Sequence, residues 1–274
     1  MRILVLLLLV LSVASCAGTN PSSPKPAAPA AAAPPVPDGR TMRVRWAGKA
    51  PADQAPPVYR VVRMKNNPAI DANWDKPAWK DVKPLTPEYY MGKEPAHQPR
   101  VQAKVAYDDE YLYVIWRVED NYVRAVATTS PGRVWCDSAV EFFFTPCEEP
   151  RKNGYYNLET NCTGHMLFAS NVPGVPNGVT KEELAQVVIT GSLKGPIDPE
   201  IAKPTTWTLE YKLPYSVLAK HSKFTRPGPG VRWGANFYKC ADETSHPHWL
   251  TWAPVTWPEP SFHRPEFFGT LVFE

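Results

Sequence analysis

The sequence predicts an all-β domain, an antiparallel β-sandwich that occupies residues 58–274. Three observations predict it. Apolar and polar residues alternate with a period of two along much of this stretch, proline accounts for 32 of the 274 residues, and ten tryptophans offer large apolar surfaces. A proline inside a helix costs about 3 kcal/mol, so this composition excludes a helical bundle. Short strands at regular spacing with little helix are typical of a sandwich.

The clearest strand pair starts at residue 101. Stretches 101–107 and 111–119 both alternate, and the acidic run 108–110 between them makes a turn, which predicts a β-hairpin. The same alternation predicts further strands at 139–145, 155–161, 207–213, 231–239, 248–252 and 269–273. Helical periodicity is limited to residues 73–80, 181–186 and 215–220.

Residues 1–15 have the pattern of a signal peptide. Arg2 supplies a positive charge, and the apolar run 3–11 is too short to span a bilayer, which needs about 20 residues. The ending Val13-Ala14-Ser15-Cys16 resembles the bacterial lipobox. That resemblance implies cleavage before Cys16 and a diacylglycerol on its thiol.

The stretch 16–40 is expected to be a disordered tether. Seven prolines and seven alanines fall within residues 17–40, so the segment cannot bury enough apolar surface to fold. Residues 41–57 then form an irregular lead-in to the sandwich. Because Ala17 rather than Asp follows the lipobox cysteine, the resemblance favours the outer membrane of a Gram-negative cell, with the domain facing the periplasm or the exterior.

Four cysteines lie in the predicted sandwich, in a compartment that permits disulfides. Cys136 and Cys147 flank the strand at 139–145, about 36 Å apart if the chain is extended, and cannot pair with each other. A hairpin of the strands at 139–145 and 155–161 would bring Cys136 near Cys162. Buried free thiols, Cys240 included, remain the alternative, since free cysteine behaves as a small apolar residue.

Glycoside hydrolysis would need two carboxyl groups on either side of a bond. Of the neighbouring acidic pairs, 108/109 and 148/149 have the pattern of turn residues, which leaves Asp137 and Glu141 as the pair for a hydrolase.

Histidines and charge exclude other classes of function. His246 and His248 would share one face of a strand, but His263 is the sole further histidine near the C-terminus and a closed metal site needs four ligands, so we expect no metal. The net charge of +3, without a basic stripe, argues against a nucleic-acid partner.

The string Trp135-Cys136-Asp137-Ser138-Ala139-Val140-Glu141-Phe142-Phe143 resembles the motif Trp-x-x-Asp-Ser-Val-Glu-x-Phe of the family 9 carbohydrate-binding modules. One extra residue separates Ser138 from Val140, while Trp135 and Glu141 keep the six-residue spacing. Further similar segments follow in chain order at 69–71 with Trp79, and at 107–114, 154–161, 207–210, 236–240 and 265–271.

This resemblance implies an immunoglobulin- or jelly-roll-like sandwich that binds the end of a glycan without cutting it and needs no cofactor. It implies an aromatic wall at Trp135, an acidic hydrogen bonder at Glu141 and a second ring at Phe262, where the family has Trp. Glu159 stands where the family has an Arg. His263 and Arg264 are candidates to replace the donors lost there.

The alternation of side chains along the strands at 139–145 and 155–161 also indicates a binding site in this region. Glu141 and Phe143 share one face of their strand, and Tyr155, Asn157, Glu159 and Asn161 share a face of the next. Two such faces side by side would form the platform that a pyranose requires, with flat rings for its CH faces and polar groups for its hydroxyls.

The sequence thus predicts a non-catalytic protein that binds oligo- or polysaccharide and assists polysaccharide catabolism beside glycoside hydrolases. Two alternatives stay open. One is a glycoside hydrolase acting through Asp137 and Glu141. The other is a non-covalent haem-binding electron-transfer domain, for which His165 and Met166 are the close His/Met pair.

Overall fold

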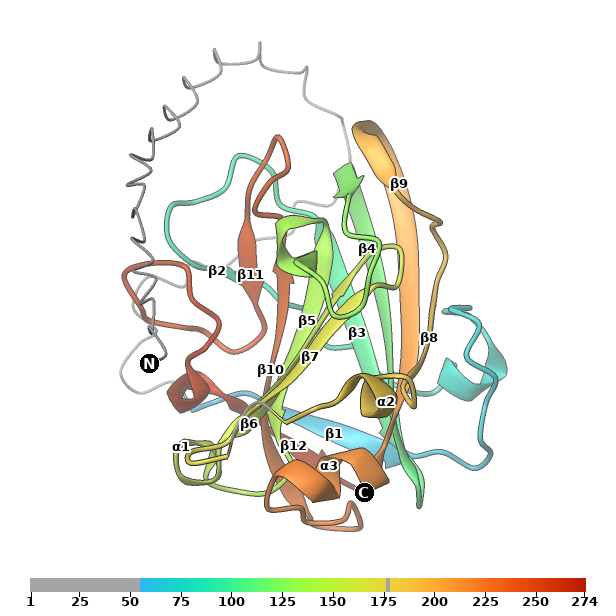
Figure 1. Cartoon of the computed structure of the whole chain (residues 1–274), viewed down its shortest axis with the longest axis vertical. Helices are drawn as coiled ribbons and strands as arrows, with labels where there is room; N and C mark the ends of the chain where they lie inside the picture. The colour runs from blue at the N-terminus through green and yellow to red at the C-terminus, as the bar shows by residue number, and fades with distance from the viewer. Residues whose placement is uncertain (1–54, 176–177) are drawn as a thin grey trace, which may run out of the picture. The chain divides into compact units, whose positions relative to one another are not determined.

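The computed structural model of the chain describes residues 55–175 and 178–274 (Figure 1). The predicted signal peptide, the lipidation at Cys16 and the tether at 16–40 lie outside these residues. Of the described residues, 42% are in strands and 11% in helices, so the prediction of an all-β fold is confirmed.

Two sheets face each other. The first, sheet A, has the order β7-β6-β5-β10-β12, with short β11 and β2 beside β10. It comprises β7 (Met166–Asn171), β6 (Tyr155–Asn161), β5 (Ala139–Thr145), β10 (Arg232–Cys240), β12 (Gly269–Phe273), β11 (Trp249–Thr251) and β2 (Tyr89–Tyr90). The second, sheet B, comprises β3 (Arg100–Tyr107), β4 (Tyr111–Ala125), β9 (Ile197–Pro214) and β8 (Val188–Gly191). The two layers are seen in Figure 1.

Strand β1 (Val58–Arg63) joins the two sheets. Its first four residues pair with β12, and Val62 and Arg63 pair with β3. Both pairings are parallel, whereas every other strand pair of the described residues is antiparallel. The predicted antiparallel sandwich is thus confirmed apart from the two parallel pairings of β1.

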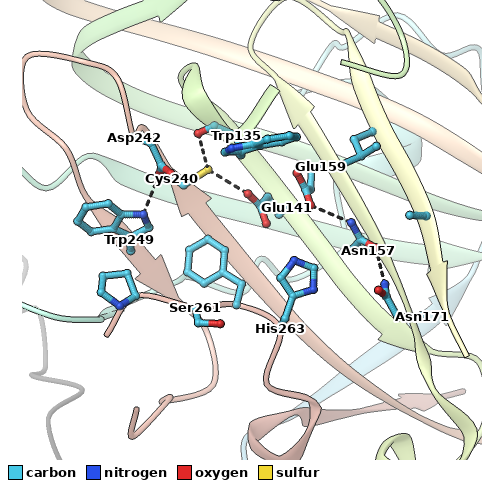
Figure 2. Close-up of a pocket in the computed structure, with 14 residues that line it drawn as sticks. Trp135, Glu141, Asn157, Glu159, Asn171, Cys240, Asp242, Trp249, Ser261 and His263 are labelled. Atoms are coloured by element: carbon cyan, nitrogen blue, oxygen red, sulfur yellow. Dashed lines mark hydrogen bonds between the residues drawn. The ribbon is translucent and has the colours of Figure 1, made fainter. Parts of the chain in front are cut away.

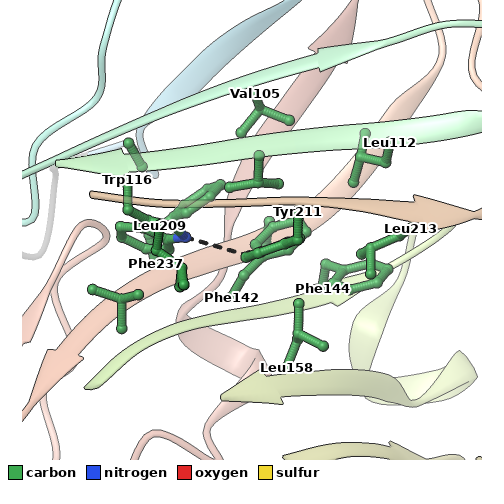
Figure 3. Close-up of a cluster of buried hydrophobic side chains, with 14 of the residues drawn as sticks. Val105, Leu112, Trp116, Phe142, Phe144, Leu158, Leu209, Tyr211, Leu213 and Phe237 are labelled. Atoms are coloured by element: carbon green, nitrogen blue, oxygen red, sulfur yellow. Dashed lines mark hydrogen bonds between the residues drawn. The ribbon is translucent and has the colours of Figure 1, made fainter. Parts of the chain in front are cut away.

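Aromatic and aliphatic side chains from both sheets fill the space between them (Figure 3). On the sheet A side, the Phe142 ring stacks on Phe144 at 4.5 Å and on Phe237 at 4.7 Å between centroids. On the sheet B side, Trp116 Nε1 donates to Tyr211 Oη at 3.4 Å. All these rings are buried, so the alternating positions of β4, β5, β9 and β10 supply the core as the period of two predicts.

The predicted hairpin is confirmed as β3 and β4, in continuous register from Arg100↔Glu119 to Tyr107↔Leu112. The predicted strand at 207–213 is the end of the longer β9. Strands β1, β2, β7 and β8 were not predicted. The four cysteines are buried and free, so the predicted proximity of Cys136 and Cys162 yields no disulfide.

Two of the three predicted helices form. These are α2 (Lys181–Leu184), which opens on a Thr180/Glu183 capping box, and α3 (Tyr215–His221); a third short helix, α1 (Pro150–Asn153), lies before β6. The helix predicted at 73–80 is reduced to a single 3₁₀ turn, η1 (Pro77–Trp79). Other 3₁₀ turns are η2 (Val134–Cys136) and η3 (Pro265–Phe267). No helix of the described parts is long and apolar enough to cross a membrane.

Pro77 prevents a helix before η1, since Lys76 ahead of it is extended, with a ψ of 151°. Glu210 of β9 then fixes the segment. Its carboxylate is fully buried and accepts hydrogen bonds from the backbone amides of Asp71 and Ala72, each at 2.9 Å, and from Trp79 Nε1 at 2.8 Å. Lys76 Nζ lies 2.7 Å away. These contacts hold an irregular segment against the outer face of sheet B, where it covers Tyr113 and Ile115.

Replacing Glu210 by Gln should lower the free energy of unfolding by about 3 kcal/mol, because the Lys76 ammonium would lose its buried partner and keep only the half-exposed carboxylate of Asp71. Urea denaturation measures this. Glu119→Gln is the matched control: it removes a half-exposed pair with Arg100 and should cost less than about 1 kcal/mol. Equal effects of the two changes would contradict the assigned role of Glu210.

Candidate functional site

The outer face of sheet A carries the polar side chains that its inner face excludes. Since Phe142 and Phe144 point into the core, Glu141 and Phe143 point outward. The register sets Glu141 of β5 directly opposite Glu159 of β6.

Glu141 and Glu159 line a cavity of about 410 Å³ (Figure 2). Two partly exposed indole rings, Trp135 from η2 and Trp249 from β11, border it. Two loops complete the lining: one follows β10 and contributes Asp242, and the other, 260–263, precedes η3. The full lining is Trp135, Glu141, Asn157, Glu159, Leu167, Ala169, Asn171, Cys240, Asp242, Trp249, Pro260, Ser261, Phe262 and His263.

Each of the two glutamates uses one carboxylate oxygen within the protein. The Cys240 thiol donates to Glu141 Oε1 at 3.0 Å, and Asn157 Nδ2 donates to Glu159 Oε1 at 2.8 Å. Within the described ranges the Oε2 atoms accept no hydrogen bond, although the residues are only 3% and 4% exposed. Because both residues line the cavity, a ligand there meets two acceptors with spare capacity.

Burial raises the pKa of both carboxyls. The pKa of Glu159 rises to about 7, mainly through desolvation, and that of Glu141 lies well above its ordinary value because desolvation adds to repulsion by Glu159. Desolvation also raises the pKa of Asp242, against the hydrogen bond from Trp249 Nε1 at 2.8 Å. The wall of the cavity is therefore an acid cluster held away from water.

A chain of amides fixes the geometry on the β6 side. Asn171 Nδ2 donates to Asn157 Oδ1 at 2.6 Å, and Asn157 in turn donates to Glu159. Figure 2 shows this chain leading from the end of β7 towards the glutamates. The orientation of Glu159 is thus set by two neighbouring strands.

Five of the six predicted binding residues line this cavity: Trp135, Glu141, Glu159, Phe262 and His263. Arg264 does not. Its guanidinium lies over the exposed ring of Trp257, 3.4 Å from the ring centroid.

Phe262 is less accessible than its predicted role requires. It is only 7% exposed, and its ring stacks on Tyr238 at 4.1 Å between centroids. The partly exposed Trp249 is better placed to offer a second face.

Sequence reasoning missed Trp249, Asp242 and Asn171 as site residues. Asp242 lies in the segment weighed for its histidines, Trp249 in the predicted strand 248–252, and Asn171 in an unpredicted strand. Asn157 was already assigned to the correct face by alternation. A search for polar residues just beyond each strand of the same sheet would have found Asp242.

The structure separates the residues of the hydrolase alternative. Asp137 accepts from the backbone amides of Val126 and Ala127 at 2.8 and 3.0 Å and from Asn161 Nδ2 at 2.8 Å. These bonds stabilise the loop before β5, and Asp137 does not line the cavity that Glu141 faces.

The residues of the haem alternative and of the metal alternative do not share a cavity either. Met166 packs in the core, whereas His165 lies in the turn before β7, so the pair does not face one cofactor. Both ring nitrogens of His248 are engaged, by Lys239 Nζ at 2.9 Å and the His246 carbonyl at 2.8 Å. Among residues 55–175 and 178–274, no group of three or more His, Cys, Asp or Glu is arranged to hold a metal ion.

A sandwich with indole rings and buried hydrogen bonders on the outer face of one sheet has the features of a sugar-binding module. A sequence model of carbohydrate-binding family 9 matches residues 75–273, and the chain belongs to this family. Comparison with curated proteins finds no match.

Solved structures agree with this assignment. A candidate carbohydrate-binding protein from Bacteroides uniformis ATCC 8492 is 29% identical, with a TM-score of 0.71 over 80% of this chain and 100% of that one. A family 9 module from Caldicellulosiruptor kristjanssonii, solved with cellotriose, is 14% identical, with a TM-score of 0.52 over 80% of this chain and 94% of its own. A family 9 module from the same organism, solved with glucose, is also 14% identical, with a TM-score of 0.51 over 78% of this chain and 95% of its own. The latter two share the fold.

The raised pKa of Glu159 predicts a pH-dependent stability. A carboxyl whose pKa rises from about 4.5 to about 7 on folding favours the folded state below pH 4.5, and this contribution is lost as the pH rises through 7. Glu159→Gln keeps the acceptor for Asn157 and cannot ionise. Its melting temperature, relative to the natural protein at the same pH, should therefore be higher at pH 8 than at pH 5. A difference independent of pH would contradict the assignment.

Proposed function

We propose that the domain binds carbohydrate in the cavity on sheet A and does not cleave it. The observation that carries this proposal is the pairing of two partly exposed rings, Trp135 and Trp249, with unsatisfied acceptors on Glu141 and Glu159. Apolar rings suit the CH faces of a pyranose, and acceptors suit its hydroxyls. A volume of about 410 Å³ lies within the usual range for small-ligand pockets.

The geometry favours binding over hydrolysis. Glu141 and Glu159 are cross-strand neighbours on one wall, whereas the two carboxyls of a glycosidase flank the scissile bond. Release of reducing sugar from a polysaccharide panel would contradict a purely binding role.

We further propose that the protein is held at the outer membrane by a lipid on Cys16 and presents its glycan to partner glycoside hydrolases. The lipobox-like ending and the Pro/Ala-rich stretch at 17–40 support this proposal. An extended tether of that composition spans about 3.1 Å per residue, which gives the domain reach.

Trp135→Ala should weaken sugar binding by about 2 kcal/mol or more, roughly thirtyfold, because a ring that anchors a ligand would be lost. Isothermal titration with glucose and cellotriose, preceded by a glycan array to include other sugars, measures this. Glu141→Gln should weaken binding as well, since one of the two acceptor oxygens that Glu141 offers at the cavity becomes an amide donor.

The matched control is Trp257→Ala, which removes an exposed ring that does not line the cavity and should leave the affinity unchanged. The melting temperature of each variant separates lost binding from lost folding. Unchanged affinity in folded Trp135→Ala would move the site elsewhere.

Cys16→Ala should release the protein from the membrane fraction of the cell, because the thiol that carries the lipid is absent. Fractionation followed by immunoblotting tests this. A variant that stays in the membrane fraction at the natural level would contradict lipid anchoring.

A further inference from the structure

We propose that the cavity selects a cationic sugar, one whose amino group is held as an ammonium by Glu141, Glu159 and Asp242. This inference rests on the proposed function and names its ligand class. Three carboxyls line the cavity, and no Lys or Arg is among the described residues that line it.

The nearest cations are committed elsewhere. Lys239 projects to the opposite face of β10, where its fully buried Nζ donates to the Cys240 carbonyl at 2.8 Å and lies 3.6 Å from Asp120 of sheet B. Arg264 stacks on Trp257, and Arg133, whose guanidinium lies 5.8 Å from the centroid of the Trp135 ring, pairs with the exposed Glu243 at 3.5 Å. The carboxyls of the cavity therefore have no ion-pair partner in the described part of the chain.

Spare acceptors at the site match the donors of an ammonium. Oε2 of Glu141 and of Glu159 accepts no hydrogen bond within the described residues, and each side chain is more than nine-tenths buried. Oδ1 of Asp242 accepts from Trp249 Nε1, and Oδ2 accepts no hydrogen bond within the described residues. A primary ammonium carries three donors, so it can satisfy one such oxygen from each residue.

A cation also relieves a cost that a neutral sugar leaves in place. Like charges directly opposite each other on neighbouring strands are destabilising, and Glu141 and Glu159 occupy such a pair of positions. A hydroxyl can donate to one carboxylate without lowering their mutual repulsion. An ammonium lowers the repulsion and is attracted to the faces of indole rings such as Trp249.

The same arrangement rejects anionic sugars. A uronic acid would bring a further carboxylate beside three others in a partly desolvated cavity. Specificity built from such repulsion is as effective as specificity built from attraction.

The test uses three β-1,4-linked trimers that differ only at carbon 2: the glucosamine trimer, the N-acetylglucosamine trimer and cellotriose. Titration calorimetry at pH 6 and at pH 7 covers both requirements, because the amines gain protons as the pH falls while Glu159, with a pKa of about 7, loses its proton as the pH rises. A charge-assisted hydrogen bond is about twice as strong as a neutral one, so we expect the glucosamine trimer to bind at least about tenfold more tightly than both neutral trimers.

Glu159→Gln should bring the ratio of the affinities for the glucosamine trimer and the neutral trimers close to one. The substitution removes a charge and keeps the shape and the Asn157 contact. Glu182→Gln is the matched control, since Glu182 is exposed on α2 and outside the cavity. It should leave the preference unchanged. Melting temperatures confirm that each variant is folded.

The outcomes are distinguishable. Equal affinity for all three trimers, or tighter binding of a neutral one, with binding lost in Trp135→Ala, would overturn the selection of a cation and leave carbohydrate binding in place. Failure of all three trimers and of every sugar on a glycan array would overturn both proposals. A preference that survives Glu159→Gln unchanged would overturn the role given to the carboxyl cluster.

Discussion

The alternation of side chains along β5 and β10 controls both the core and the cavity. These central strands of sheet A are buried on both faces, and their register aligns Phe142 with Phe237 on the inside while Glu141 and Tyr238 face outward. A slip of one residue would send every core ring to the outer face and place the glutamate between the sheets. The packing energy of the aromatic core therefore also holds the acid cluster in position.

Two buried acids of this protein show how differently the same side chain can be used. Glu210 is surrounded by donors from the segment that it fixes, including a lysine ammonium, so its burial is compensated. Glu141 and Glu159 oppose each other, each with a single donor and an oxygen to spare. Buried acids that lack compensation are a cost to folding, which is typical of a site organised for a ligand.

The sequence predicts what is local and misses what converges from a distance. The β3–β4 hairpin is evident because alternation and its acidic turn lie within one short stretch. The helix expected at 73–80 fails at Pro77, which leaves Lys76 extended. Where the irregular segment lies depends on Glu210, far along the chain, which holds the amides of Asp71 and Ala72. The likeness to a family motif found Trp135 and Glu141. No pattern indicated that Trp249 would reach the same cavity, since its place depends on the pairing of β11 with β10.

The pairing of β1 with β12 has a consequence for the order in which the protein can be assembled. β1 is the first described strand to be translated and β12 the last, yet they are neighbours, with Val58 beside Thr270. β12 also forms the link between β1 and β10, so sheet A has a gap until the final strand arrives. Contacts between such remote parts of a chain slow folding. A nascent or truncated chain that lacks β12 would present the open edges of β1 and β10 together, and these edges are where premature association with other chains would begin.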